Sequence, residues 1–133
     1  MKQIELLAPA GGMEQLEYAI AAGCDAVFLG TTAYSARANA GNFEMDALEE
    51  AIDYCHLRQV KCYLAMNTLL KNDEILEALE TLGYAYEMGI DGVIVQDIGF
   101  ASLIRQHYPD LPLHASTQMS AQSLEDVQFL EGM

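Results

Sequence analysis

A set of polar side chains in this 133-residue sequence could do chemistry, and each follows a short apolar run. The set is Arg37, Asn39, Asn67, Gln96, Asp97, His114, Ser116 and Gln118. Arg37 could clamp a carboxylate or phosphate, Asp97 is a fixed anion or base, and His114 can move a proton near neutral pH. The amides carry both donors and acceptors, which suits reading a nucleobase or holding an organic acid. We therefore predict Asp97, His114 and Arg37 as catalytic and the other five as substrate-binding. The alternative is a hydrogen-bonded rim without chemistry.

The apolar runs that precede these residues predict five strands, each followed by a helix. The predicted strands are residues 4–8, 26–29, 61–66, 93–95 and 113–117. Val93, Ile94 and Val95 are β-branched with no alternating polar residue, which is typical of a parallel strand covered on both faces. The strand-first order predicts an α/β fold of five consecutive parallel βα units. It fits either an open doubly wound sheet or part of a TIM-type (βα)₈ barrel.

The helices are predicted from apolar stripes and capping residues. Asn72 is the expected N-cap of the third helix, whose inner face would carry Ile75, Leu79, Leu82 and Tyr86. Ser123 is expected to cap the last helix, with Asp126 at the capping-box position. The inward-facing residues of that last helix would be Leu124, Val127 and Leu130.

A repeated phrase supports the βα series and bears on domain organisation. Gly23-Cys24-Asp25 and Gly89-Ile90-Asp91 each precede a predicted strand, and Gly132 stands where a further strand would follow. We therefore expect a single domain, residues 1–133, that is a truncated N-terminal portion of a barrel. Because parallel strands place their carboxyl ends together, we expect Arg37, Asp97 and His114 to meet at one mouth.

Composition and charge limit the classes of function. The net charge is −14, with six basic residues, so the segment alone lacks the electrostatic footprint of a nucleic-acid-binding protein. No run approaches the about 20 apolar residues of a membrane span, and no signal pattern opens the chain. We expect a cytoplasmic protein with no membrane contact. Cys24, Cys55 and Cys62 lack CxxC spacing and are expected to be reduced structural thiols.

Several ordered motifs resemble a known family, the collagenase-like peptidases of peptidase family U-32. They are Glu5-Leu6-Leu7-Ala8-Pro9-Ala10-Gly11, Ala22-Gly23-x-Asp25-Ala26-Val27-x-Leu29-Gly30, Ser35-Ala36-Arg37, Asn42-Phe43, Met66-Asn67-Thr68-Leu69, Val93-Ile94-Val95-Gln96-Asp97-x-Gly99 and Leu113-His114-Ala115-Ser116-Thr117-Gln118-Met119. The chain is most similar to the branch that hydroxylates bases in ribosomal or transfer RNA. That resemblance implies an iron–sulfur cluster held by four cysteines downstream of this segment. Cys24, Cys55 and Cys62 correspond to none of them, so no cofactor or metal is expected within the segment.

Two alternatives to the hydroxylase remain open, so the substrate is either RNA or a peptide. The family name implies a peptidase, and a triad of Ser116, His114 and Asp97 can be written down. However, the sequence has no HExxH and no nucleophile elbow. The third hypothesis is that the isolated chain is an inactive half-site of a longer enzyme.

The predicted first and fifth strands bear on assembly. Both would be exposed, apolar sheet edges without protecting lysines or bulges. We therefore expect the isolated chain to form a homo-oligomer.

Overall fold

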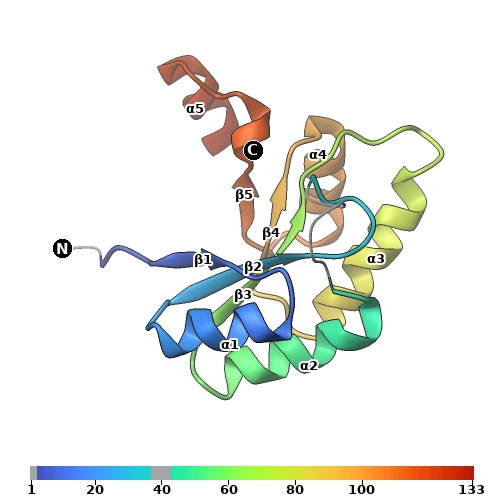
Figure 1. The fold of residues 1–133 in the computed structure, drawn as a ribbon. Coiled ribbons are helices and arrows are strands. Elements are labelled where there is room, and N and C mark those ends of the chain that lie inside the picture. Colours follow the sequence, from blue (N-terminus) through green and yellow to red (C-terminus); the bar gives the residue numbers. More distant parts are fainter. Residues whose placement is uncertain (1–2, 37–42) are drawn as a thin grey trace.

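Five strands alternate with five α-helices in the computed structural model, which describes residues 3–36 and 43–133 (Figure 1). The first elements are β1 (Leu7–Pro9), α1 (Met13–Ala21), β2 (Ala26–Gly30), α2 (Met45–His56), β3 (Lys61–Met66) and α3 (Ile75–Glu87). They are followed by β4 (Gly92–Val95), α4 (Ile98–His107), β5 (Leu113–Ala115), a 3₁₀ helix η1 (Thr117–Met119) and α5 (Leu124–Glu131). The predicted α/β series of five βα units is confirmed.

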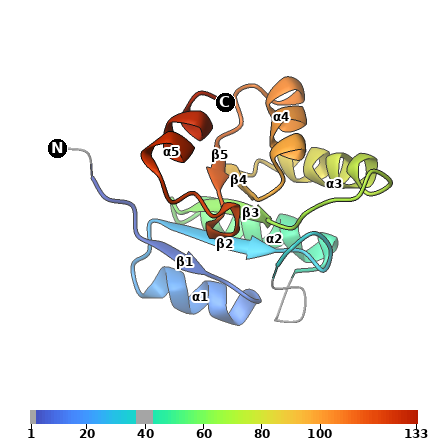
Figure 2. The same cartoon turned by 90° about the horizontal axis from the view of Figure 1, so that it is seen from above.

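The strand order distinguishes between the two architectures that the sequence left open. All neighbouring strands are parallel, and their order in the sheet is β1-β2-β3-β4-β5. A doubly wound sheet reverses its direction of growth at a switch point, whereas a barrel adds every strand on the same side. Right-handed crossovers in one direction then place all helices on one face. Figure 2 shows the helices as an outer arc around the strands. The chain is therefore part of a barrel.

The hydrophobic core lies between the sheet and the outer helices. Successive strand residues point to opposite faces, so Val27 and Leu29 of β2 and Leu64 of β3 face the helices. Their buried partners on the helices include Leu16, Leu48, Ile52, Leu82, Phe100 and Ile104. Burial of each such side chain contributes about 1.5–3 kcal/mol, so this layer holds the strands in direction and register. The residues between them, such as Tyr63 and Ile94, face the inner side of the arc.

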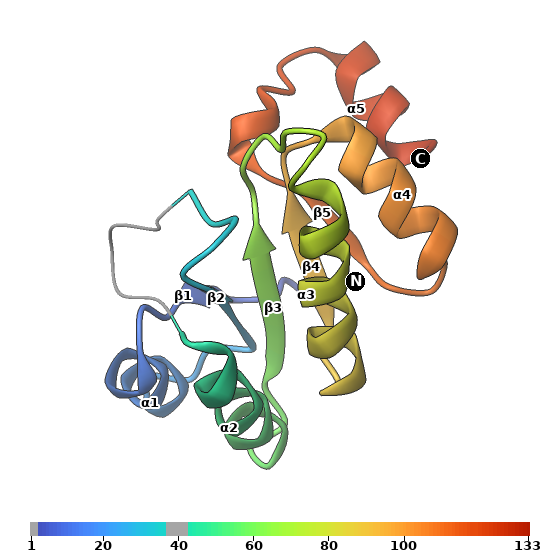
Figure 3. The same ribbon diagram turned by 90° about the vertical axis from the view of Figure 1, so that its right-hand side faces the viewer.

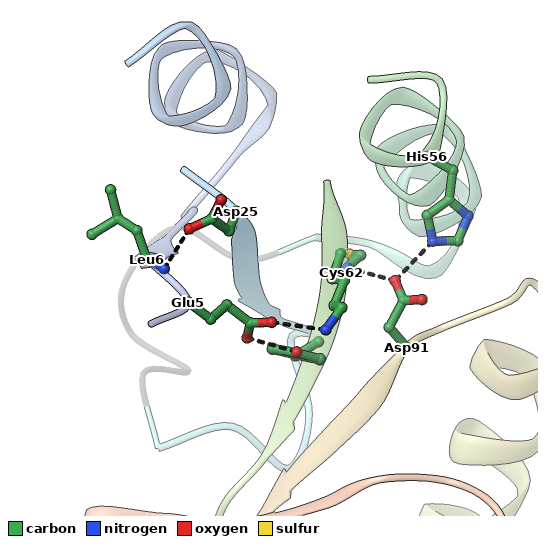
Figure 4. A network of polar contacts seen from close by, with 8 residues as sticks. Glu5, Leu6, Asp25, His56, Cys62 and Asp91 are labelled. Carbon is green, nitrogen blue, oxygen red and sulfur yellow. Dashed lines mark hydrogen bonds and ion pairs between the residues drawn. The ribbon is translucent and has the colours of Figure 1, made fainter. Parts of the chain in front are cut away.

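The repeated Gly-x-Asp phrase has one structural role in both copies, at the amino end of the sheet (Figure 4). Gly23 and Gly89 both have φ of 93°, a conformation that favours glycine. The Asp25 carboxylate accepts the backbone N–H of Leu6 at 2.7 Å, and the Asp91 carboxylate accepts that of Cys62 at 2.7 Å. Each aspartate therefore ties the start of its own strand to the start of the preceding one. Gln59, with φ of 59°, occupies the glycine position before β3.

The predicted bounds of the second and fourth strands are each short by one residue, and those of the first and fifth strands need a larger correction. Strand β1 spans Leu7–Pro9 rather than 4–8, and Ile4 is 90% exposed. The cause is Asp25, whose side chain takes the N–H of Leu6 before regular pairing begins. Strand β5 ends at Ala115 because Ser116 is already the N-cap of η1. Both β1 and β5 have a single strand neighbour, and the predicted self-association stays a prediction.

Two helix predictions also need correction. Helix α3 begins after Glu74, not Asn72, because Glu74 accepts the backbone N–H of Lys71 and forms the preceding turn. On the same helix Tyr86 is exposed rather than inward-facing.

The capping box of Ser123 and Asp126 on α5 is confirmed, but Leu124 and Val127 are 67% and 53% exposed. A barrel helix packs over its own strand and the next one, and the sheet described here offers α5 only β5.

Candidate functional site

The carboxyl ends of β3, β4 and β5 lie at one end of the molecule, and Figure 3 shows β3 and β4 pointing toward it. The described residues that sequence analysis assigned to this edge are Asn67, Gln96, Asp97, His114, Ser116 and Gln118. Arg37 and Asn39 were predicted for the same site but lie outside the described residues. Their predicted convergence with the others stays a prediction.

Asn67 connects three separate segments at this edge. Its Oδ1 accepts the backbone N–H of Ala36, in the connection after β2, at 3.0 Å. Its Nδ2 donates to Ser116 Oγ, at the end of β5, at 3.2 Å. The bridge therefore crosses the end of β4 and joins the connections that follow β2, β3 and β5. The Asn67 amide thus donates a hydrogen bond through its nitrogen and accepts one through its oxygen.

Ser116 is the buried centre of the same network. It is only 7% exposed, and its Oγ accepts the Asn67 amide and the backbone N–H of Gln118, each at 3.2 Å. The backbone N–H of Ser116 donates to Val95 O at 2.8 Å, which extends the β4–β5 ladder by one bond. Ser116 is thus held by two strands while its hydroxyl oxygen is shared by two donors.

Two glutamines complete the network on its exposed side. Gln96 Nε2 donates to the backbone carbonyl of Gln118 at 3.2 Å, so the ends of β4 and β5 are joined a second time. The side-chain amide of Gln118 is exposed and forms no hydrogen bond within the described ranges. We define Asn67, Gln96, Ser116 and Gln118 as the amide network. It offers an incoming polar molecule both donors and acceptors, with Asn67, Gln96 and Ser116 held by hydrogen bonds.

Asp97 stands at the same edge but is occupied by the backbone. One carboxylate oxygen accepts the N–H of Phe100 at 2.8 Å and caps α4, and the other accepts the N–H of Leu70 at 3.2 Å. A carboxylate at a helix N-terminus is stabilised by the helix dipole as well as by these bonds. In this arrangement Asp97 anchors the connection after β3 to the start of α4.

His114 has different surroundings from the amide network. Its ring packs on Tyr63, with centroids 4.6 Å apart and planes tilted by 42°. Its Nε2 is buried without a hydrogen-bond partner among the described residues, and burial lowers the pKa of the imidazole. Within residues 3–36 and 43–133, no hydrogen bond joins His114 to Ser116 or to Asp97. The structure therefore does not assemble the triad that can be written from the sequence.

A second group of polar residues was missed by sequence analysis. Glu5 accepts hydrogen bonds from Tyr63 Oη at 2.7 Å and from Lys61 Nζ at 2.9 Å (Figure 4). Bonds from Lys61 and Tyr63 lower the pKa of Glu5, while burial and the Glu5 carboxylate raise that of Tyr63 to about 12. Glu5 and Tyr63 are 58 positions apart, so no local pattern links them. The one sign of this group in the sequence is a tyrosine within an otherwise apolar predicted strand.

The thiols do not fit an iron–sulfur cluster. Cys24, Cys55 and Cys62 are all free and buried, on the α1–β2 turn, on α2 and on β3. The described part of the chain holds no group of three His, Cys, Asp or Glu side chains placed to bind a metal. A cluster held by downstream cysteines therefore stays a prediction. Separately, no described helix is long and apolar enough to span a membrane.

Comparison with known proteins identifies relatives of the chain. The model of peptidase family U32 matches residues 11–133. The chain is 35% identical over 129 residues to tRNA hydroxylation protein P of Escherichia coli K12, covering 97% of this chain and 28% of that protein. It is 36% identical over 128 residues to 23S rRNA 5-hydroxycytidine C2501 synthase of the same organism, covering 96% and 19%. The chain thus spans less than a third of either relative.

A solved structure supports the assignment of the fold. The structure of the U32 peptidase Mk0906 superposes with a TM-score of 0.79 over 99% of this chain and 57% of that one. At 17% sequence identity this likeness shows the fold alone. It agrees with the partial barrel deduced from the strand order.

Proposed function

The chain belongs to peptidase family U32, and on this premise we propose that it is the N-terminal barrel portion of an enzyme that hydroxylates a base in ribosomal or transfer RNA. Two relatives at 35% and 36% identity carry names that describe tRNA hydroxylation and a 5-hydroxycytidine of 23S rRNA. The whole enzyme would have further parts, since the chain covers 28% and 19% of those proteins.

The amide network is the observation that carries this proposal. A base edge presents donors and acceptors side by side, and side-chain amides match such an edge with two hydrogen bonds. The network places its amides at the carboxyl end of a partial barrel, where barrel enzymes have their active sites. Asn67 and Ser116 are pre-positioned by bonds to Ala36, Gln118 and Val95, so little ordering would be needed on binding.

The charge of the chain indicates how the RNA backbone would be held. With a net charge of −14, this segment repels phosphates, so it can contact a base only if basic surface elsewhere in the enzyme holds the strand. A single extruded base could enter the barrel mouth while the backbone stays outside. The proposal therefore gives this segment base recognition and gives the rest of the enzyme the phosphate contacts.

A peptidase is the second candidate, supported by the family name and by the name of the Mk0906 relative. Two contacts count against a serine mechanism at Ser116. Its Oγ already accepts two N–H groups, and the Asp97 carboxylate holds Phe100 and Leu70 rather than His114. A nucleophilic serine needs a base within hydrogen-bond reach, and the described residues give Ser116 none.

The test is a nucleoside analysis of RNA from cells that lack the protein. We expect one hydroxylated nucleoside to disappear from ribosomal or transfer RNA and to return on complementation with the wild-type gene. Asn67→Ala should fail to restore it, because the bridge to Ala36 and Ser116 is lost. Asn72→Ala is the matched control, since Asn72 is exposed and caps no helix. Unchanged RNA, together with gelatin cleavage that Ser116→Ala abolishes, would favour the peptidase.

A further inference from the structure

His114 lies apart from the amide network, on the inner face of the sheet. It is paired with Ile94 of β4, and both belong to the strand face opposite Val93 and Val95, which pack on the helices. Its ring reaches back toward the amino half of the sheet, where it meets the ring of Tyr63 on β3. The two rings thus extend over β4 from either side.

Gly92 of β4 makes this approach possible. A Cβ atom at position 92 would lie 3.1 Å from Tyr63 Cδ1 and 3.2 Å from His114 Nε2. It would also lie 3.1 Å from the backbone carbonyl oxygen of Pro112. Because Gly92 has no side chain, both rings can lie close to the backbone of β4. His114 Nε2 is thus enclosed beside Gly92 and Tyr63.

The two ring nitrogens of His114 therefore differ. Nε2 is fully enclosed and has no hydrogen-bond partner in the part of the chain that the structure describes. Nδ1 forms no hydrogen bond within the described ranges, yet it is not a buried atom without a partner as Nε2 is. Nδ1 is therefore the accessible nitrogen of the ring. A proton on Nε2 would be a buried N–H without an acceptor, which is costly, whereas a proton on Nδ1 leaves only a lone pair enclosed.

The charged groups around the ring act in opposite directions. Strand β3 contributes Tyr63 and Lys61, the segment before β1 contributes Glu5, and β4 contributes only Gly92 and Ile94. The Glu5 carboxylate raises the pKa of His114 and Lys61 lowers it, but burial is the largest cause and lowers it. Glu5 is itself fixed by Tyr63 at 2.7 Å and by Lys61 at 2.9 Å.

We propose that His114 is held as the neutral imidazole with its proton on Nδ1, and that it donates this N–H to an oxygen of a ligand inside the barrel. Tyr63 acts as a positioning residue that encloses Nε2, and Glu5 positions Tyr63 through its hydroxyl. The acceptor is an sp² oxygen, either a base carbonyl or a carboxylate. The choice of ligand rests on the proposed function, whereas the tautomer does not.

The tautomer can be observed directly by nitrogen-15 NMR of the imidazole rings. The chain has three histidines, so His56→Gln, His107→Gln and His114→Asn variants assign each signal. We expect His114 to show a protonated Nδ1 and a bare Nε2 at neutral pH. Its titration midpoint should lie below that of the same residue in the protein unfolded by urea. A proton on Nε2, or a midpoint at or above the unfolded value, would overturn the proposal.

Two variants at Tyr63 form a matched pair. Tyr63→Phe keeps the ring over Nε2 and should preserve the tautomer. Tyr63→Ala uncovers Nε2, so the titration midpoint should rise toward the unfolded value and both tautomers should appear. Gly92→Ala gives an independent check, because its Cβ displaces the ring from the same side. An unchanged His114 spectrum in a folded Tyr63→Ala or Gly92→Ala protein would contradict the role of the enclosure.

Addition of ligand fragments separates the two acceptor chemistries. A shift of the Nδ1 signal with a pyrimidine nucleoside assigns a base carbonyl, and a shift with acetate assigns a carboxylate. A response to neither compound overturns the ligand part of the proposal. Because none of these measurements uses hydroxylation, failure here is distinguishable from failure of the proposed function.

Discussion

At the amino end of the sheet, aspartates tie the start of one strand to the start of the next, whereas at the carboxyl edge polar side chains tie together the connections that follow the strands. Asp25 accepts the N–H of Leu6, just before β1, and Asp91 accepts that of Cys62 in β3, each at 2.7 Å, so these carboxylates help to make the fold. The carboxyl edge instead has longer bonds between connections, from Asn67 to Ser116 and from Gln96 to Gln118, each at 3.2 Å. The side chains in these bonds keep unused donors or acceptors. A barrel can thus keep its stability at one end and leave the other end free for binding.

Asp97 is the exception that connects the two patterns. It lies at the carboxyl edge, yet it holds the backbone as Asp25 and Asp91 do, and with both of its oxygens rather than one. Residue type and position alone therefore do not identify a catalytic carboxylate. The hydrogen-bond partners of its oxygens must also be known.

The largest effect on stability is expected at Asp91. Asp91→Ala leaves the buried-strand N–H of Cys62 without its acceptor and also removes the partner of His56, which lies 2.8 Å from Asp91. Loss of a hydrogen bond to a charged group costs about 1.5–3 kcal/mol, which urea unfolding would detect. Asp110→Ala, at an exposed position with no side-chain hydrogen bond in the described part, is the control. Equal stability of the two variants would remove the distinction between the two ends.

Two substitutions separate the capping role of Asp97 from the role of its charge. Asp97→Ala should lower the free energy of unfolding by about 0.5–2 kcal/mol, because the cap on α4 is lost. Asp97→Asn keeps one oxygen for the cap and is an equally good N-cap, but its Nδ2 cannot accept the N–H of Leu70, so its loss of stability should be smaller than that of Asp97→Ala and come from that one bond. If Asp97→Asn restores RNA hydroxylation in cells, the residue positions the edge. A stable but inactive Asp97→Asn protein would instead identify the carboxylate as catalytic.

The pH dependence of stability should carry two signatures. The pKa of His114 is lowered in the folded protein, so below about pH 6.5 the unfolded chain binds more protons than the folded one. The free energy of unfolding therefore decreases as the pH falls from there. The pKa of Glu5 is also lowered, so its contribution is present above the ordinary glutamate range and is lost in more acidic solution. Urea unfolding across this range should show His114→Asn removing the first loss and Glu5→Gln the second. Identical profiles for all three proteins would contradict both assignments.

The smallest effect is expected at Gln59. Its φ of 59° places a side chain in the left-handed region, where Gly23 and Gly89 stand in the equivalent turns. Gln59→Gly should raise the free energy of unfolding by about 0.5–1 kcal/mol, since glycine adopts this conformation without strain. Gly23→Ala, with φ of 93°, should have the opposite sign. A destabilised Gln59→Gly protein would show that its side chain has a compensating contact.

Sequence reasoning predicted the elements well because their signals are local. Apolar runs gave the strands, and Ser123 with Asp126 gave the last cap within four residues. The exposure of Leu124 and the boundary at Leu7 depend on what lies across the sheet, which periodicity does not report.

The candidate site was predictable only in part for the same reason. The bridge from Asn67 to Ser116 spans 49 positions and that from Glu5 to Tyr63 spans 58. Strand direction places Asn67 and Ser116 at one edge, but nothing local shows that Asp97 is occupied or that His114 turns toward Tyr63.

The strand order also has a consequence for how the chain folds during synthesis. Every strand pairs with the one made just before it, so each new βα unit can dock on a surface that has already left the ribosome. A doubly wound sheet would have to wait for distant strands to flank the first. Sequential winding keeps most loop closures short, which lowers their entropic cost and favours fast folding. The protein can therefore assemble its scaffold in order, with the bridge from Asn67 to Ser116 formed only when β5 arrives.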